Sequence, residues 1–542
     1  MANSMDNEYP NRLLIVGLDG LNWQLLAPLL DAGVMPHLDR LRREGAYGPL
    51  TSVVPTQSAA AWASFITGQN PARHGVLDFV LRQADGSYRH AKPDPEATLW
   101  HHAGRAGLRV GVLNFPVTYP PDPVNGFLVS GMLSPKGRTF THPPGLGDEM
   151  LSAVPGYRLD LEWQLYAGRE GALLRDLTEM TRQRAAAARY LQARYPCDLL
   201  AVAFVGPDRL QHALWRHLDP THPHHSPNEA ATLADDIHRF YATLDEALGQ
   251  LVTAAGDGAA VIVLSDHGFQ PAAWQFRVDE WLAERGWLAW QAGHSRLERW
   301  VRKLDTPWVR HVRRRLVKDI SRHFPTFSPG GTVDWSRTVA FCPWTEQQGI
   351  RLNVKDREPD GIVSRSTYGP LREEIRHALL ETTDPHSGQK VVDRVWRREE
   401  LYEGPFFDQM PDLVFTLRPG FASSPTQQRL WSATGWASGD HSLEGIFVAW
   451  GRGVAAGPVT GAELISVAPT ALHLLGQPVP TGMDGKVLTR ILTAPFVASH
   501  PVRFAEAAPE GSVRDLRPSA AQTLTVEEEA DIQERLRGLG YL

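Results

Sequence analysis

Cysteine is nearly absent from this chain of 542 residues, in which only Cys197 and Cys342 occur. Both lie among apolar or aromatic neighbours, which suits buried free thiols. So few cysteines exclude a disulfide framework and argue against a CxxC-type metal site. Because free thiols are usual in a reducing compartment, we expect a cytoplasmic protein.

Long hydrophobic runs are also missing. The first apolar stretch, Leu13 to Val16, is too short for the core of a signal peptide. No segment reaches the roughly 18 apolar residues that a membrane helix requires. The net charge is only -6, which gives no overall reason to expect a nucleic-acid partner. We therefore expect no stable nucleic-acid partner and no transmembrane segment; the oligomeric state stays open.

The residues that are present suit a large globular protein, with 42% hydrophobic and 21% charged residues. Short aliphatic runs end in acidic or glycine-containing turns, as buried parallel strands do. These runs are LLIVGLDG at 13–20, RVGVLNFP at 109–116, DLLAVAFVGPD at 198–208 and AAVIVLSDHG at 259–268, and a long helical stretch follows the second run at 171–195. The alternation predicts a three-layer α/β/α fold with a mostly parallel central sheet.

The amino-acid composition changes between residues 278 and 398, which are rich in tryptophan and arginine. We interpret this segment as a cap inserted into a catalytic core of residues 1–277 and 399–495. Within the cap, apolar residues from Val309 to Phe324 recur at helical spacing opposite a basic face, and a solvated helix is favoured there over a polyanion-binding surface. Residues 496–542 are expected to form a linker and a C-terminal helical tail.

Two carboxylate–histidine pairs could bind metal ions. Asp208 and His212 are four residues apart, so a helical turn would place both on one face. Asp266 and His267 follow a buried strand directly, at the edge of the sheet where ligands bind in such folds. Each pair alone has a plain structural explanation, as a surface pair or a turn.

Three further segments complete a possible site. Asp19 ends the first strand, and His441 lies in a polar, glycine-bracketed segment. Ser58 precedes small alanines that suit the start of a helix, where backbone N–H groups could face a phosphate, although an ordinary N-cap serine has the same pattern. Together the five segments supply enough ligands for two ions.

These segments resemble the type I phosphodiesterase/nucleotide pyrophosphatases of the alkaline phosphatase superfamily. The landmarks occur in the family's order, as GLDG (17–20), PTQSAAAWASFITGQNPARHG (55–75), DRLQH (208–212), SDHGF (265–269), GDHSLEG (439–445) and VAPTALHLLG (467–476). The resemblance covers residues 12–275 and 400–490 and implies an alkaline-phosphatase-like core that hydrolyses a small phosphoester, such as a nucleotide or another diester.

The resemblance also implies a role for each site residue. One ion would be held by Asp208, His212 and His441, and the other by Asp19, Asp266, His267 and the Ser58 oxygen. Zn²⁺ is expected, and Mn²⁺ is compatible with the same nitrogen and oxygen ligands. Ser58 would be the nucleophile: an ion beside its hydroxyl lowers the pKa, and the alkoxide then forms a phosphoseryl intermediate.

The segment around Ser58 departs from many eukaryotic relatives, which have a threonine nucleophile and an asparagine three positions later. Here the later position is Ala61, so the donor to the phosphate oxygen lies elsewhere. Asn114 is the candidate for substrate binding, although a turn-forming role is favoured for it. Since the nearest arginine in sequence is Arg73, a singly charged diester is expected to be preferred over a monoester, unless a cap arginine such as Arg351 reaches the site.

Other activities on the same scaffold stay open. They are a phosphomonoesterase, a phosphoglycerate-mutase-like phosphotransferase and a phospho-headgroup transferase. A sulfatase is disfavoured because the residues after Ser58 lack the C/S-x-P-S-R pattern. A non-catalytic binding protein is least favoured, since a degenerate site would have lost some of its seven ligands.

Overall fold

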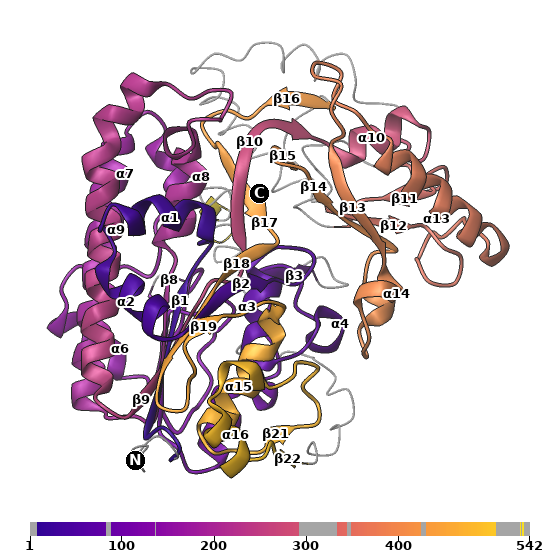
Figure 1. Cartoon of the computed structure of the whole chain (residues 1–542). Coiled ribbons are helices and arrows are strands. Elements are labelled where there is room, and N and C mark those ends of the chain that lie inside the picture. The colour runs from indigo at the N-terminus through magenta and orange to yellow at the C-terminus, as the bar shows by residue number, and fades with distance from the viewer. Residues whose placement is uncertain are drawn as a thin grey trace.

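The computed structural model describes residues 8–82, 88–135, 137–291, 333–343, 348–423, 430–505, 532 and 534–535. They form a large α/β core and a smaller unit beside it (Figure 1). The predicted helix from Val309 to Phe324 lies outside the described residues, as does most of the predicted C-terminal tail. Ile532 of that tail is buried in the main hydrophobic core.

A ten-stranded sheet forms the middle of the core. Its order is β19 (Gly457–Pro458), β2 (Ala46–Thr51), β18 (Glu444–Gly451), β9 (Ala259–Leu264), β1 (Arg12–Leu18), β8 (Leu199–Phe204), β5 (Val110–Leu113), β6 (Gly126–Val129) and β7 (Thr141–His142), with β20 (Ala462–Glu463) paired to β2. The strands from β9 to β6 are parallel, whereas β18 runs antiparallel to both of its neighbours. Strands β1, β8 and β9 are aliphatic and almost wholly buried, as strands covered on both faces are.

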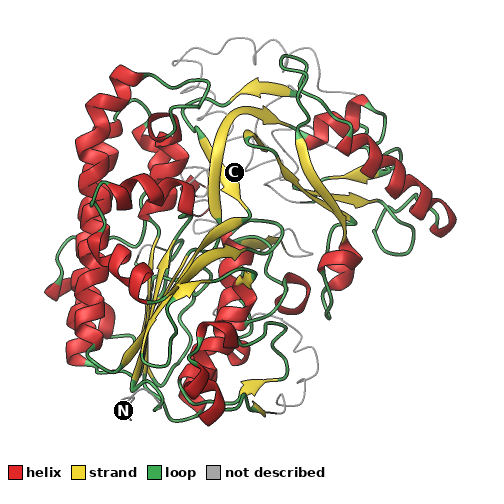
Figure 2. Ribbon diagram, in the orientation of Figure 1, coloured by secondary structure: helices red, strands yellow, loops and turns green. Residues whose placement is uncertain are grey.

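Helices cover the two faces of this sheet (Figure 2). One layer contains the long helices α7 (Glu170–Arg194) and α9 (Pro227–Ala255) together with α1 (Trp23–Asp31), α2 (Pro36–Glu44), α6 (Leu146–Ala153) and α8 (Gly206–Leu218). The other contains α3 (Ser58–Thr67), α5 (Leu99–Arg105), α15 (Val467–Leu474) and α16 (Ala494–Ser499). The predicted three-layer α/β fold with a mostly parallel sheet is confirmed. None of the described helices has the length and apolar character needed to cross a membrane.

The smaller unit has a sheet of its own, called the cap sheet here. It contains, in order, β11 (Ala340–Phe341), β12 (Gly349–Leu352), β14 (Leu413–Leu417) and β13 (Val392–Arg397), and it packs with α10 (Val278–Glu284) and α13 (Arg365–Leu380) around a second hydrophobic core. α14 (Arg398–Leu401) follows β13. Because β14 pairs with β12 and β13, the cap sheet extends beyond residue 398, where the sequence-based division ends the cap.

A connecting sheet joins the cap to the core. The long strand β10 (Gly268–Phe276) pairs with β15 (Gly420–Ser423), β16 (Trp431–Ala433) and β17 (Gly439–Ser442). One end of β10 lies at the carboxyl end of β9 and the other leads into α10, so this strand carries the chain from the central sheet into the cap (Figure 1).

The segment predicted to be a linker differs from expectation at its start. Residues 494–499 form α16, whose Phe496 is buried in the main core, and β22 (Phe504–Ala505) pairs with β21 (Val479–Pro480). Burial of one aromatic ring therefore extends the ordered core past residue 496. Two small elements remain, the hairpin of β3 (Val80–Arg82) and β4 (Tyr88–His90) and the short helix α4 (Pro71–His74).

The cap depends on one buried carboxylate. Asp412 accepts two hydrogen bonds of 2.7 Å from the Arg357 guanidinium, one of 2.7 Å from Leu352 N and one of 2.7 Å from the Tyr368 hydroxyl. Burial alone would raise the pKa of Asp412, but the bonds from Arg357 hold it below its usual value. Loss of this carboxylate would remove two hydrogen bonds of the partly buried Arg357 guanidinium, which would keep only those to Glu358 and to Leu352 O.

We expect Asp412→Ala to destabilise the cap by about 3 kcal/mol. Amide hydrogen exchange in β12 and β14 should then become roughly 100-fold faster, because exchange follows the free energy of local opening. Asp408→Ala is the matched control, since the Asp408 side chain is 85% exposed. Equal exchange rates in the two variants would contradict the role assigned to Asp412.

Candidate active site

The carboxyl ends of three neighbouring strands bring the predicted acidic residues together. Asp19 follows β1, Asp208 lies in the first turn of α8 after β8, and Asp266 and His267 follow β9. Since β9, β1 and β8 are adjacent and parallel, their ends meet at one edge of the sheet. All four residues are at most 1% exposed.

Two more segments reach this edge from elsewhere in the chain. Ser58 is the first residue of α3, and its Oγ lies 3.0 Å from His267 Nε2. His441 lies on β17, whose pairing with β10 sets it opposite Phe269 and close to His267. The His267 and His441 rings stack with centroids 3.8 Å apart. The structure therefore brings together residues up to about 420 positions apart in sequence.

The carboxylates of Asp19 and Asp266 are each anchored through one oxygen. Asp19 Oδ2 accepts from the Trp62 indole N–H at 3.4 Å, and Asp266 Oδ1 accepts from Gly20 N at 3.2 Å. The other oxygens, Asp19 Oδ1 and Asp266 Oδ2, are buried without a hydrogen-bond partner. A buried oxygen without a donor is costly unless a cation faces it.

Asp208 repeats this arrangement with a stronger anchor. Its Oδ1 accepts from Arg209, whose guanidinium also donates to both oxygens of Asp160 at 2.9 and 3.2 Å. Asp208 Oδ2 has no hydrogen bond and lies 3.3 Å from His212 Nε2. Burial would raise the pKa of Asp208, but His212 and Arg209 hold it well below its usual value. Asp208 therefore presents a charged oxygen.

The three histidines are oriented by backbone carbonyl groups. These are Gly439 O for His212 at 3.0 Å, Thr56 O for His441 at 2.8 Å and Gly268 O for His267 at 3.0 Å, each measured to Nδ1. A carbonyl oxygen can only accept, so each Nδ1 carries the proton and, in the neutral ring, Nε2 presents a lone pair. The same arrangement orients histidines that bind metal ions.

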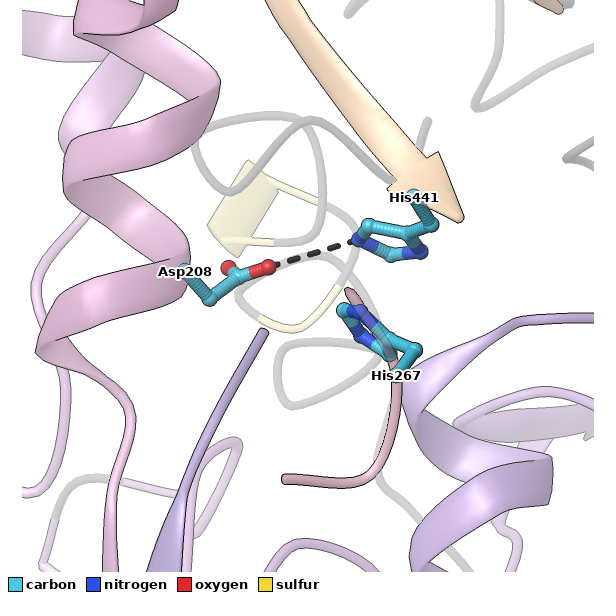
Figure 3. A group of neighbouring side chains, drawn as sticks. All are labelled: Asp208, His267 and His441. Atoms are coloured by element: carbon cyan, nitrogen blue, oxygen red, sulfur yellow. Dashed lines mark ion pairs between the residues drawn. The ribbon is translucent and has the colours of Figure 1, made fainter. Parts of the chain in front are cut away.

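These lone pairs and free oxygens converge. His212 Nε2 and His441 Nε2 are 3.0 Å apart, and each lies 3.3 Å from Asp208 Oδ2. Figure 3 shows Asp208 and His441 turned toward one another, with His267 beside them. Acceptors so close repel one another unless a proton or a cation lies between them. Ligand atoms of a tetrahedral Zn²⁺ site would be about 3.3 Å apart, so this spacing suits one ion.

A second convergence surrounds His267. Its Nε2 lies 3.3 Å from Asp266 Oδ2, 3.6 Å from Asp19 Oδ1 and 3.0 Å from Ser58 Oγ. Two compact groups of ligand residues result, one of Asp208, His267 and His441 and one of Asp19, Asp266 and His267. His267 belongs to both, whereas the sequence assigns it to the second alone. The donor set fits two divalent cations.

In the second ligand group, burial and crowding raise the pKa values of both carboxyl groups. Burial and then the charges of Asp266 and Asp208 raise the pKa of Asp19 well above its usual value. Burial and the charge of Asp208 raise the pKa of Asp266 to about 7. Burial and then His441 lower the pKa of His267. A bound cation would stabilise the carboxylates and keep the imidazole neutral.

Asn114, the predicted substrate-binding residue, is engaged elsewhere. Its amide oxygen accepts from the Tyr157 hydroxyl, and its Nδ2 lies 3.5 Å from Ser130 O. It is 1% exposed and has a φ of 60°, in the left-handed region that asparagine tolerates better than most residues. These contacts fit the turn-forming role.

The arginines considered from the sequence are also paired. Arg73 bonds Asp484 at 2.9 Å, and Arg351 bonds Glu358 at 2.5 Å within the cap. Arg209 is the guanidinium that sequence reasoning missed, although its place beside Asp208 in DRLQH was a signal. Its second partner, Asp160, carried no such signal, because only the fold brings residue 160 to α8.

A cleft of about 400 Å³ opens beside this group of ligands, between the core and the cap sheet. His441 and Thr56 lie on its core wall, and strands β13 and β14 contribute its cap wall. The cleft therefore connects the buried acceptors with the cap.

Comparison with solved structures identifies proteins of similar fold. A search of curated proteins finds no significant match. The fold is similar to that of phosphonoacetate hydrolase from Sinorhizobium meliloti 1021 in complex with phosphonoacetate, with a TM-score of 0.53 and 19% identity over 86% of this chain and 96% of that one. For the same enzyme in complex with phosphonoformate, the TM-score is 0.51 and the identity is 19%, over 86% of this chain and 96% of that one. Murine ectonucleotide pyrophosphatase/phosphodiesterase 5, in complex with AMP, has a TM-score of 0.48 and 14% identity over 89% and 100%.

The family model for type I phosphodiesterase / nucleotide pyrophosphatase matches residues 13–444. This range contains every residue of the two ligand groups and the cap. The chain belongs to the type I phosphodiesterase / nucleotide pyrophosphatase family.

Proposed function

We propose that this protein is a phosphodiesterase with Ser58 as the nucleophile and two bound divalent metal ions. One observation carries the proposal: three carboxylates and three histidines each have one polar atom anchored by the protein and the other turned into a buried site without a hydrogen. Anchored acceptors of this kind are costly in an empty core and suit cations.

The residues divide between the two ions as follows. Asp208, His212 and His441 would hold one, and Asp19, Asp266, His267 and Ser58 the other. Bound ions would supply Lewis-acid stabilisation of the attacking and leaving oxygens. Zn²⁺ fits the mixed nitrogen and oxygen donors, and Mn²⁺ is also compatible.

The start of α3 supports Ser58 as the nucleophile. Ser58 is fully buried at the first position of the helix, and Gln57 before it makes no capping hydrogen bond with its side chain. N–H groups of a first helical turn have no partners within the helix, so they can donate to phosphate oxygens. Ser58 Oγ would attack phosphorus and lose its proton, the first alcohol would leave, and water would then cleave the phosphoseryl ester.

We expect metal-replete protein to contain close to two divalent ions per chain, measured by elemental analysis after desalting. Asp19→Ala combined with Asp266→Ala should retain about one ion, because only one ligand group is disrupted. Asp39→Ala removes a carboxylate that pairs with Arg42 and Arg43 on α2, and it should retain both. A chelator should abolish hydrolysis, and Zn²⁺ or Mn²⁺ should restore it. One ion or none in the replete wild type would contradict the two-ion proposal.

Ser58→Ala should lower kcat by about a thousandfold or more, because it removes a covalent nucleophile. Its metal content should change little, since Ser58 is one ligand among seven. Ser64→Ala is a control in the same helix: the Ser64 hydroxyl bonds His74 at 2.8 Å and is not part of the ligand groups. A Ser58→Ala variant that keeps more than about a tenth of wild-type kcat would reject the serine nucleophile.

The ester class follows from the charge near Ser58. The described arginines discussed above are paired with carboxylates, so none offers an uncommitted cation to the extra charge of a monoester. We expect kcat/KM for bis-p-nitrophenyl phosphate to exceed that for p-nitrophenyl phosphate by at least about tenfold at matched pH and metal. Equal or higher efficiency on the monoester would show that the ester class is wrong.

A further inference from the structure

The cleft between core and cap has the chemistry of a binding site for one organic arm of the substrate. It has a volume of about 400 Å³, and His441 of the first ligand group lies on its wall. A phosphodiester whose phosphorus lies beside Ser58 would therefore have room for one ester arm in this cleft. This step rests on the proposed function.

Six of the fourteen residues that line the cleft carry a hydroxyl or an amide group. Thr51, Thr416 and Ser442 are among them, and a hydroxyl group can both donate and accept a hydrogen bond. Gln348 is 5% exposed, and its Oε1 is buried without a hydrogen-bond partner. An amide oxygen of this kind can accept a hydrogen bond from an O–H or N–H group of a ligand.

The charged and polar groups of the cleft disfavour three other kinds of ester arm. Asp393 and Glu444 line it together with Arg394, which lies 3.7 Å from Asp393, so the three formal charges sum to a net negative charge. A second phosphate group is disfavoured there. A choline group has no O–H or N–H to donate to Gln348, and a long acyl chain would leave the charged and amide groups of the lining without partners.

Trp396 is the one tryptophan, tyrosine or phenylalanine among the described residues that line the cleft. Trp396, on β13, is partly buried against the small hydrophobic cluster that contains Val54 and Met410. One indole supports one face of a ring, which suits a sugar or cyclitol whose hydroxyl groups bond the surrounding amides and hydroxyls. A nucleobase held between two aromatic rings would need a second ring.

From this lining we propose that the cleft binds a neutral, hydroxyl-rich ester arm, a sugar or another polyol. Gln348 accepts a hydrogen bond from one of its hydroxyl groups, and Trp396 packs against its carbon skeleton. The substrate is then a phosphodiester that carries a polyol, and the specificity of the enzyme depends on residues of the cap.

Three p-nitrophenyl diesters test the proposal, because they share a leaving group and differ in the second arm. Their arms are glucose linked through its 6-hydroxyl, choline and thymidine linked through its 5′-hydroxyl. We expect kcat/KM for the glucose ester to exceed the other two by about tenfold or more. Gln348→Leu should lower kcat/KM for the glucose ester about tenfold more than it lowers kcat/KM for bis-p-nitrophenyl phosphate. Gln389→Leu, an exposed glutamine of the cap, is the control.

A higher kcat/KM for the choline or thymidine ester would overturn the polyol assignment while phosphodiesterase activity stands. An equal loss of kcat/KM on every ester in Gln348→Leu would overturn it as well. Binding measurements test the polyol assignment independently of turnover. The metal-loaded Ser58→Ala variant should bind the glucose ester about tenfold more tightly than the thymidine ester by calorimetry, and adding Gln348→Leu should remove the difference. Equal affinities would overturn the inference, and absent hydrolysis by the wild type would reject the proposed function instead.

Discussion

Mutual repulsion among buried acceptor atoms is the constraint around which this molecule is organised. Asp208 Oδ2, His212 Nε2 and His441 Nε2 lie within 3.3 Å of one another. Such a group can persist in a core only if the surrounding structure holds each member in place. The backbone carbonyls on each Nδ1 and the donors on each carboxylate hold these atoms in place, and bound cations would offset the cost of the arrangement.

The fold meets this constraint by dividing the anchors among rigid elements. Parallel strands β9, β1 and β8 fix Asp266, Asp19 and the turn before Asp208, while β17 delivers His441 through its pairing with β10. The same strand β10 continues into the cap. A single element therefore connects the position of His441 with the cap, whose strands form one wall of the cleft.

The sequence predicted the parts of this arrangement that are local. Strand ends followed by Asp19 and by Asp266 and His267 can be located in the sequence, because buried parallel strands are continuously aliphatic and their carboxyl ends are where ligands bind. The end of the cap was placed at residue 398 because β14 is aliphatic like a core strand, and only its pairing with β12 shows where it belongs. The roles of Asp160, Gln348 and Trp396 could not be predicted from the sequence, because each role depends on a contact with a distant segment.

The division between core and cap separates chemistry from selectivity. Every residue proposed to act on phosphorus lies on core elements or on β17, and each is fixed by at least one hydrogen bond or close polar contact that would not change with the ester arm. Gln348 and Trp396 lie on the opposite wall, on the cap sheet or directly before one of its strands. Substitutions in that wall can change the bound alcohol without disturbing the charged atoms that any phosphodiester requires. The family's reaction would then be retained while the cap determines which ester it acts on, and the partly polar, net negative lining of the cleft supports an uncharged polyol arm.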